Sequence, residues 1–218
     1  MRDEKFAIIG LGNFGATVAR ELADLKCKVT AIDSDKNKIQ DLDQKAELAI
    51  VADATERKFL ENLGVENYTC FVISTGKDSH ASILITLHLK ELGARKIIVK
   101  ANSSDHARIL MKVGANDALI PEEQMAIRIS HSLAKPNLLD FLPLSGDYYV
   151  AELKPGKKFI DRMLKDIAIR SEYHVQVIAV RNSISGQTGF APGGDYKITK
   201  NDILIVLGKG EDIEKIKE

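Results

Sequence analysis

Three glycines near the start of the chain, Gly10, Gly12 and Gly15, have the spacing of a phosphate-binding loop. They follow an apolar stretch over residues 6–9 that predicts a strand, and they open a stretch over 13–25 with apolar residues at helical spacing. In such a loop the first glycine permits a tight turn, the second lets the backbone approach a phosphate, and the third lets the helix pack closely on the strand. The helix N-terminus adds free N–H groups and a partial positive charge. We therefore expect this loop to hold the phosphate of a nucleotide.

Asp33 is a carboxylate at the position where Rossmann folds contact the ribose. Asp33 lies at the end of the next predicted strand, 18 residues after Gly15. A carboxylate at this place accepts hydrogen bonds from both hydroxyls of a ribose. The same charge repels a 2′-phosphate, so NADP is not the expected ligand. The alternative is that Asp33 caps a helix beside a turn that is merely tight.

The remaining polar patterns do not form a reaction site. Tyr196 and Lys200 have a YxxxK spacing, but that pair works on one face of a helix, and here it leads into a predicted strand. His80, His88 and His131 fall in helical patterns, where packed or exposed side chains are expected. The sequence has no HExxH, GxSxG or Walker A motif. These patterns predict a nucleotide site without catalytic residues, in a protein that is not an enzyme.

The elements that must position these residues alternate along the first part of the chain. Apolar runs typical of buried strands alternate with helical patterns, which predicts a parallel sheet covered on both faces. One of the helices is expected to start at Thr55 as N-cap and to stop at Gly64. The pattern changes near 136–146, after which strands and helices are mixed. The expected fold is α/β: a Rossmann-like, doubly wound parallel sheet over residues 1–135, followed by a small α+β domain over 136–218.

Composition narrows the class of protein. Lys and Arg number 31, as do Asp and Glu, so the chain lacks the basic excess of a nucleic-acid binder. Its apolar runs are too short to cross a bilayer, and its charged first residues do not form a signal peptide. Cys27 and Cys70 lack metal-ligand spacing and are expected to be buried free thiols in a reducing cytosol.

One predicted helix, over residues 79–92, is apolar almost all the way round. A helix of this kind must be covered on every side. The cover is either the rest of the chain or a second subunit, and both alternatives remain open.

Nearly the whole chain resembles the cytosolic regulatory subunits of Ktr/Trk bacterial potassium uptake systems, nearest the Ktr type. The segments that carry the resemblance are FAIIGLGNFGATVARELADL, AIDSDKNKI, VADATERKFLENLGV, IVKANSSDHARILMKVGANDALIPEEQMA and NDILIVLG. It implies an N-terminal RCK domain (regulator of potassium conductance) followed by a small RCK C-terminal domain.

The resemblance also implies how such a subunit works. Dimers would assemble into an octameric homo-oligomeric ring on the cytoplasmic face of the plasma membrane, beneath a membrane-embedded potassium transporter. ATP or ADP would bind in the Rossmann cleft and change the shape of the ring. NAD or NADH is the alternative ligand. The competing interpretations are a small NAD-dependent oxidoreductase and a free-standing NAD(H) redox sensor.

The resemblance assigns roles around the predicted cleft. Asp33 would hold the ribose, Asp53 would border the adenine, and Glu122 would lie near the terminal phosphate, where it could bind Mg²⁺ or Ca²⁺ together with the nucleotide. The implied contacts are Gly10, Gly12, Asn13, Phe14, Gly15, Asp33, Ser34, Asp53, Ala54, Thr75, Gly76 and Lys77, followed by Lys100, Asn102 and His106 facing the phosphates and by Glu122.

Four of these positions have simple structural alternatives. Lys100 can be an ordinary solvated cation at the end of a strand, and His106 can lie on an exposed helical turn. Asp53 can be a helix cap, and the helix dipole favours Glu122 at a helix N-terminus. In addition, many Ktr relatives carry an arginine at the position of Asn13, which donates hydrogen bonds but has no charge for the phosphate.

The small C-terminal domain resembles one that binds cyclic di-AMP in some Ktr subunits. Arg170, Asn182 and Pro192 fall where those contacts lie. An arginine near a dimer axis could meet a phosphodiester. The alternative is that Arg170 is an ordinary surface residue.

Overall fold

The computed structural model describes residues 4–42, 46–134 and 138–216. The chain divides into two compact units, Met1–Glu122 and Glu123–Glu218. The domain boundary expected between residues 135 and 136 stays a prediction.

The first unit is built on a six-stranded parallel sheet with the strand order β3-β2-β1-β4-β5-β6. The order reverses between β1 and β4, as in doubly wound Rossmann folds, and the predicted fold is therefore confirmed. The strands are β1 (Lys5–Ile9), β2 (Lys28–Asp33), β3 (Leu48–Val51), β4 (Cys70–Ile73), β5 (Ile97–Lys100) and β6 (Asp117–Leu119).

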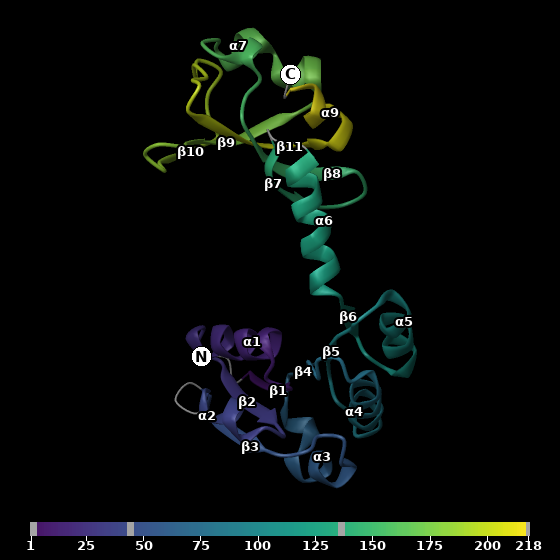
Figure 1. Ribbon diagram of the computed structural model, residues 1–218. Helices are drawn as coiled ribbons and strands as arrows, with labels where there is room; N and C mark the ends of the chain where they lie inside the picture. The colour runs from purple at the N-terminus through teal and green to yellow at the C-terminus, as the bar shows by residue number, and fades with distance from the viewer. Residues whose placement is uncertain (1–3, 43–45, 135–137, 217–218) are drawn as a thin grey trace. The chain divides into compact units, whose positions relative to one another are not determined.

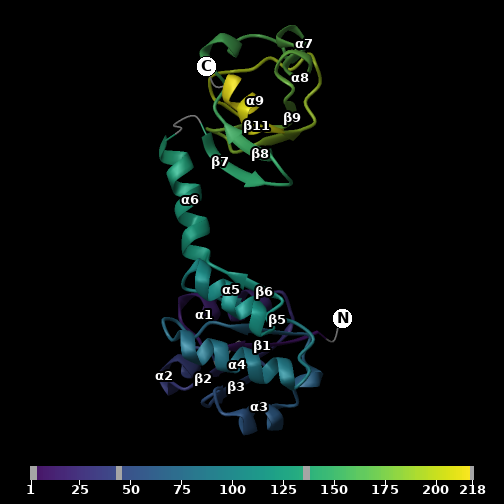
Figure 2. The ribbon, with the colours of Figure 1, turned by 90° about the vertical axis from the view of Figure 1, so that its right-hand side faces the viewer.

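Helices cover both faces of this sheet. Both faces of strand β1 carry apolar side chains that must be covered. Ile8 packs into one apolar core, while Ala7 and Ile9 pack into the other. The core around Ile8 is closed by α1 (Asn13–Asp24) and α2 (Lys36–Gln40). The opposite core is closed by α3 (Arg57–Leu63), the short 3-10 helix η1 (Val65–Asn67), α4 (Ser79–Glu91) and α5 (Ser104–Val113). Figure 1 shows α1 and α3 on opposite sides of the strands, and Figure 2 shows them from the side.

The start of α3 differs from the prediction. Its N-cap is Glu56, and the helix begins at Arg57, two residues after the expected cap at Thr55. The Thr55 hydroxyl instead donates to the Asp53 carboxylate at 2.7 Å, so both side chains belong to the turn that precedes the helix. The predicted stop is confirmed, because Gly64 ends the helix in the left-handed region at φ 73°.

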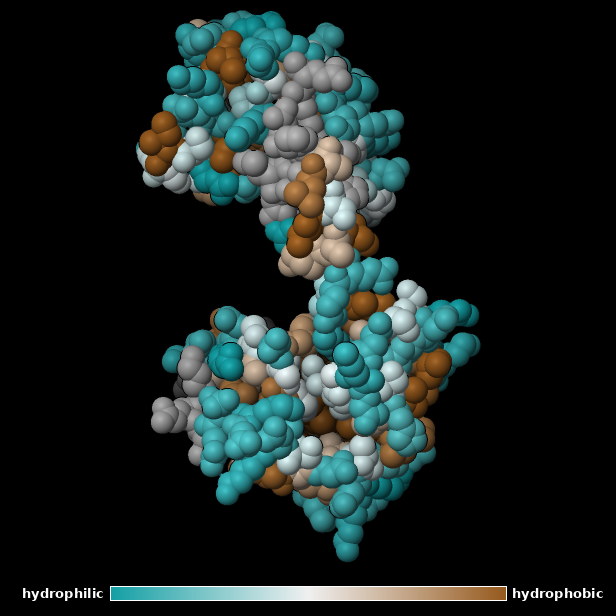
Figure 3. All heavy atoms as spheres, in the orientation of Figure 1, coloured by the Kyte–Doolittle hydropathy of each residue, from teal (hydrophilic) through white to brown (hydrophobic). Residues whose placement is uncertain are grey.

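The apolar helix α4 is covered by the described chain on one side. Ile85 and Leu89 are buried in the core, whereas Leu87 is 39% exposed. The neighbouring helix α5 also exposes Ile109 and Met111. Figure 3 shows apolar atoms at the surface on the side of this unit that carries α5.

The second unit is an antiparallel five-stranded sheet with helices, as the α+β pattern predicted. The strand order is β10-β9-β11-β8-β7, and the described residues of the strands and helices share an apolar core. The strands are β7 (Leu138–Pro143), β8 (Tyr148–Leu153), β9 (Gln176–Asn182), β10 (Thr188–Phe190) and β11 (Asp202–Lys209). The helices are α6 (Pro121–Ala134), which begins in the first unit, and η2 (Lys157–Phe159), α7 (Leu164–Ile167), α8 (Ile169–Tyr173) and α9 (Gly210–Lys215). The sequence patterns did not predict β7 or β10.

Cys27 and Cys70 are free thiols, but only Cys70 is buried, and burial raises its pKa. Within the described ranges, no helix has both the length and the apolar character needed to span a membrane.

Candidate functional site

A cavity of about 470 Å³ lies at the carboxyl ends of the central strands in the first unit. Its lining comes from the segments that follow β1, β2, β3 and β4 and from the first turns of α4. This is the crevice where the strand order reverses, the place at which open α/β sheets bind ligands. Of the predicted contacts, the lining contains Gly10, Gly12, Asp33, Ser34, Asp53, Ala54, Thr75 and Gly76.

The three glycines of the loop have different roles. Gly10 has φ +89°, and a Cβ there would lie 2.2 Å from the carbonyl oxygen of Ser74. A Cβ on Gly15 would lie 2.0 Å from the carbonyl oxygen of Gly10. At Gly12, by contrast, no atom of the described residues lies within 4 Å of such a Cβ. Packing within the fold therefore explains Gly10 and Gly15, whereas Gly12 keeps space free for an occupant of the cavity.

The N-terminus of α1 opens beside this free space. Gly12 is the N-cap of the helix, and no side chain of the described residues caps it. The first N–H groups of a helix lack partners within the helix, and phosphate oxygens can accept from them. The arrangement fits a phosphate, although Asn13 in the first turn adds no charge.

Asp33 is held as a fixed acceptor at the end of β2. Its Oδ2 accepts from the Leu11 amide at 2.6 Å, and its Oδ1 accepts from the Asp35 amide at 2.9 Å. The ammonium group of Lys38 lies 3.2 Å from Oδ2. Burial acts to raise the pKa of Asp33, but these three donors outweigh it and lower the pKa below its usual value. The carboxylate is therefore ionised, and it lines the cleft.

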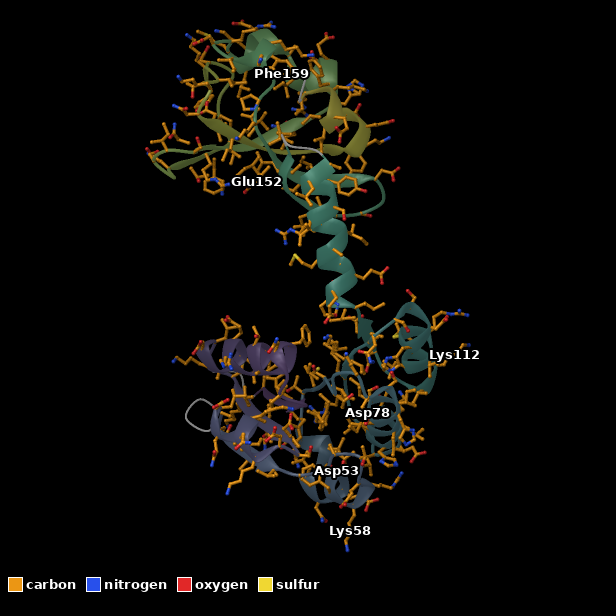
Figure 4. The ribbon with its side chains drawn as sticks, in the orientation of Figure 1. Asp53, Lys58, Asp78, Lys112, Glu152 and Phe159 are labelled. Carbon is orange, nitrogen blue, oxygen red and sulfur yellow. The ribbon has the colours of Figure 1, made fainter. Side chains whose placement is uncertain are left out.

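Two further carboxylates border the cavity and are labelled in Figure 4. Asp53 accepts from the Thr55 hydroxyl and from the Thr55 amide, and these bonds lower its pKa. Asp78 is the N-cap of α4 and accepts from the Ala81 amide at 2.9 Å. Asp53 is thus not the helix cap of its structural alternative, because Glu56 is the N-cap of α3; it shapes the preceding turn and also lines the cavity.

The other predicted contacts do not line this cavity. Asn13, Phe14 and Gly15 form the first turn of α1, and Lys77 is exposed in the connection between β4 and α4. Lys100, Asn102, His106 and Glu122 lie farther along the sheet edge, at β5 and β6. Their predicted roles toward phosphate stay predictions.

Lys100 and Glu122 form an ion pair at this second part of the edge. Lys100 is the last residue of β5, and Glu122 is the second residue of α6. The Lys100 side chain is 17% exposed and that of Glu122 is 67% exposed. The hydrogen bond from Lys100 lowers the pKa of the Glu122 carboxyl, which is therefore ionised at neutral pH.

His106 is buried between α4 and α5 rather than exposed on a helical turn. Its Nε2 lies 3.0 Å from the Ser82 hydroxyl, and its Nδ1 accepts from the Asn102 amide at 3.2 Å. Burial lowers the pKa of His106, in keeping with a neutral ring. The Asn102 side chain donates to the Ser79 hydroxyl at 3.3 Å, so the same network joins the first turn of α4 to the segment before α5.

Among the ionisable side chains that line the cavity, Lys38, Asp78 and His80 were not predicted. The sequence carried a signal for Asp78, because an Asp directly before a helical pattern predicts an N-cap beside the sheet edge. Lys38 lies in a short polar helix, where a lysine is expected to be solvated. Nothing in its spacing separates it from an ordinary surface residue.

The YxxxK pair does not form a catalytic dyad. Neither Tyr196 nor Lys200 lies in a helix. The Tyr196 hydroxyl donates to the Asp202 carboxylate at 3.0 Å. Burial raises the pKa of the Tyr196 phenol, and the hydrogen bond to Asp202 raises it further. Tyr196 therefore joins the start of β11 to the preceding loop.

A separate cavity of about 670 Å³ lies in the second unit. Arg170 and Pro192 line it, together with residues of α7, α8 and β9. Asn182 does not line it. Its side-chain oxygen accepts from the Ile184 and Ser185 amides in the turn after β9. Cyclic di-AMP binding here stays a prediction.

The fold and the main cleft define a class of protein: a Rossmann-type domain with a cleft at the strand-order reversal, joined to a small α+β unit. Residues 6–121 match the TrkA-N domain family, and residues 148–218 match the TrkA-C domain family. The chain belongs to the Ktr/Trk family of potassium uptake proteins, whose regulatory subunits are not enzymes.

Similar proteins agree with this assignment. The chain is 34% identical to the Ktr system potassium uptake protein C of Bacillus subtilis (strain 168), over 99% of this chain and 96% of that protein. The GsuK channel bound to NAD matches 99% of this chain and 38% of its own, with a TM-score of 0.54 and 16% identity. GsuK bound to ADP matches 60% of this chain and 34% of its own, with a TM-score of 0.52 and 22% identity. These two structures share the fold.

Proposed function

We propose that this protein is a nucleotide-sensing regulatory subunit of a potassium uptake system. The observation that carries the proposal is the cleft in which the free space at Gly12, the uncapped start of α1 and the ionised Asp33 lie together. These groups suit a phosphate and a ribose, the two parts that every adenine nucleotide shares. The similarity of this chain to the Ktr system potassium uptake protein C of Bacillus subtilis supports a role in potassium uptake.

The proposed ligand is ATP or ADP, with NAD or NADH as the second candidate. The cavity covers the segments after β3, β2, β1 and β4, where the adenosine and the first phosphate of all four ligands would lie. A ligand that also reaches Glu122 must extend past β4 and β5. At the usual strand spacing, β6 lies about 14 Å from β1. The structures of GsuK with NAD and with ADP support both candidates.

Isothermal titration calorimetry with ATP, ADP, NAD and NADH tests this proposal. Mass spectrometry of nucleotide retained by the purified protein gives an independent readout. Adenine nucleotide without nicotinamide would exclude both an oxidoreductase and an NAD(H) redox sensor. Absence of binding by all four ligands would contradict the proposed function.

The proposed assembly is a homo-oligomeric ring of dimers, octameric in size, on the cytoplasmic face of the plasma membrane. It would act on a membrane-embedded potassium transporter, without inserting into the bilayer or binding nucleic acid. Cyclic di-AMP is a further proposed ligand of the second unit, at the cavity lined by Arg170.

The protein is expected to be an oligomer, held in part by α4. Leu87 on α4 and Ile109 and Met111 on α5 are exposed apolar side chains of the first unit, and their burial against a second copy would stabilise an assembly. Light scattering at micromolar concentration, with and without nucleotide, checks this expectation. Replacing Leu87 with Lys should shift the mass toward the monomer, while Lys90→Glu on the same helix serves as a charge control. A monomer for the wild type in all conditions would contradict the ring.

Glu122 is expected to make the site distinguish ATP from ADP through a divalent cation. A carboxylate repels a terminal phosphate unless a positive charge lies between them, and Mg²⁺ binds phosphates with only one or two carboxylates. Lys100 already supplies one positive charge to Glu122. We expect Mg²⁺ or Ca²⁺ to strengthen ATP binding more than ADP binding, because only ATP offers the γ-phosphate.

Calorimetry of both nucleotides with and without Mg²⁺ measures this difference. Glu122→Gln should abolish it, while Glu123→Gln, the neighbouring residue on α6, should leave it intact. An equal response of ATP and ADP to Mg²⁺ in the wild type would refute the role of Glu122.

A further inference from the structure

Lys38 contacts the acid at the proposed ribose position. It lies on α2, lines the cleft, and its side chain is 45% exposed. Its Nζ is 3.2 Å from Oδ2 and 3.4 Å from Oδ1 of Asp33. One ammonium group therefore faces both carboxylate oxygens from the side of the cleft.

The acceptor capacity of Asp33 is filled in this state. An ionised carboxylate has about four lone-pair sites, two on each oxygen. The Leu11 amide occupies a site on Oδ2 and the Asp35 amide occupies a site on Oδ1. The Lys38 ammonium lies within hydrogen-bond distance of both oxygens, which adds one donor contact to each. Both amides belong to the backbone of turns that the fold fixes, whereas the lysine side chain is long and half-exposed.

A ribose needs the same two sites. Its 2′- and 3′-hydroxyls donate to the two oxygens of such a carboxylate. The backbone donors cannot leave without unfolding the turns, so the group that gives way is the ammonium of Lys38. A ligand without these hydroxyls makes no such demand.

We infer that Lys38 is a specificity-determining residue that competes with the ribose diol for Asp33. This inference rests on the proposed function, because it assumes an adenine nucleotide in the cleft. The ion pair between Lys38 and Asp33 stabilises the free protein and is lost on binding. A contact made only in the free state lowers the affinity for the ligand that breaks it.

The test compares ADP with 2′,3′-dideoxy-ADP, whose sugar has no hydroxyl for Asp33. ADP is chosen because ATP, NAD and NADH all contain its adenosine and first phosphate. Calorimetry is carried out on the full-length wild type, on Lys38→Met and on Lys36→Met. Lys36 is exposed on the same helix and does not line the cleft, so its replacement matches the change in net charge. Circular dichroism confirms that each variant is folded, and Lys38→Gln provides a second uncharged side chain.

Lys38→Met is expected to bind ADP about two- to ten-fold more tightly than the wild type, the range given by a partly exposed ion pair. Its affinity for 2′,3′-dideoxy-ADP should change less than two-fold, and Lys36→Met should not tighten ADP binding. Weaker ADP binding by Lys38→Met would overturn the inference, because it would make Lys38 a ligand contact. Equal effects on both nucleotides would also overturn it. A wild type that binds neither nucleotide would instead overturn the proposed function.

Discussion

Gly15→Ala is expected to destabilise the protein by about 3 kcal/mol or more, at the upper end of the range for overpacked sites. Gly15 lies inside α1, where helix propensity alone predicts that alanine stabilises by up to about 1 kcal/mol. The contact decides the sign, because the added Cβ would lie 2.0 Å from the carbonyl oxygen of Gly10. Backbone cannot give way as a flexible side chain can. Urea denaturation followed by circular dichroism measures the free energy of unfolding.

Gly12→Ala is the matched control for this substitution. Gly12 has φ −67°, which alanine adopts without strain, and its Cβ would meet no atom of the described residues within 4 Å. The variant should therefore fold normally and lose affinity for nucleotide, because the methyl group fills the space proposed for a phosphate. A stabilised Gly15→Ala would contradict the packing at the loop. Unchanged nucleotide affinity in Gly12→Ala would show that the phosphate does not bind beside Gly12.

Asp33→Ala is expected to weaken binding of adenine nucleotides about ten- to one hundred-fold. A hydrogen bond to a charged group contributes about 1.5–3 kcal/mol, and each factor of ten in affinity corresponds to about 1.4 kcal/mol. The substitution removes both proposed ribose contacts, together with the acceptor of the Leu11 amide. Calorimetry with ADP measures the change.

Asp35→Ala is the control for the loss of a neighbouring carboxylate, because Asp35 caps α2 and does not line the cleft. Its effect on ADP binding should stay within about two-fold. Asp33→Asn keeps one carbonyl oxygen that can accept from the backbone amides, so this variant is expected to fold even if Asp33→Ala does not. An Asp33 variant that is folded and binds ADP as tightly as the wild type removes Asp33 from the site.

The sequence predicted the first unit well because local pattern and topology agree there. Apolar runs alternate with helical patterns, and the glycine loop and Asp33 both follow directly from strand ends. The second unit was harder to predict. Pro143 and Gly146 indicate a loop, yet β7 is an edge strand, where proline is tolerated. β10 has only three residues, too few for any periodicity.

The parts of the site that sequence could not predict depend on contacts between distant residues. The pair of Lys100 with Glu122 requires β5 and β6 to be neighbours in the sheet. The orientation of His106 depends on how α5 rotates against α4, and helical spacing does not specify this rotation. The role inferred for Lys38 depends on the distance between its ammonium and Asp33, which the sequence does not show.

The uncapped start of α1 makes ligand occupancy part of the stability of the fold. Gly12 forgoes a side-chain cap, which costs a helix only a few tenths of a kcal/mol relative to Ser or Asp and leaves its first N–H groups available to a ligand. A ligand that binds only the folded state shifts the folding equilibrium by an amount that grows with the logarithm of its concentration. On the proposed function, the nucleotide concentration of the cell sets how long the subunit survives as well as what it signals. A shortage of nucleotide would thus reduce the number of sensors.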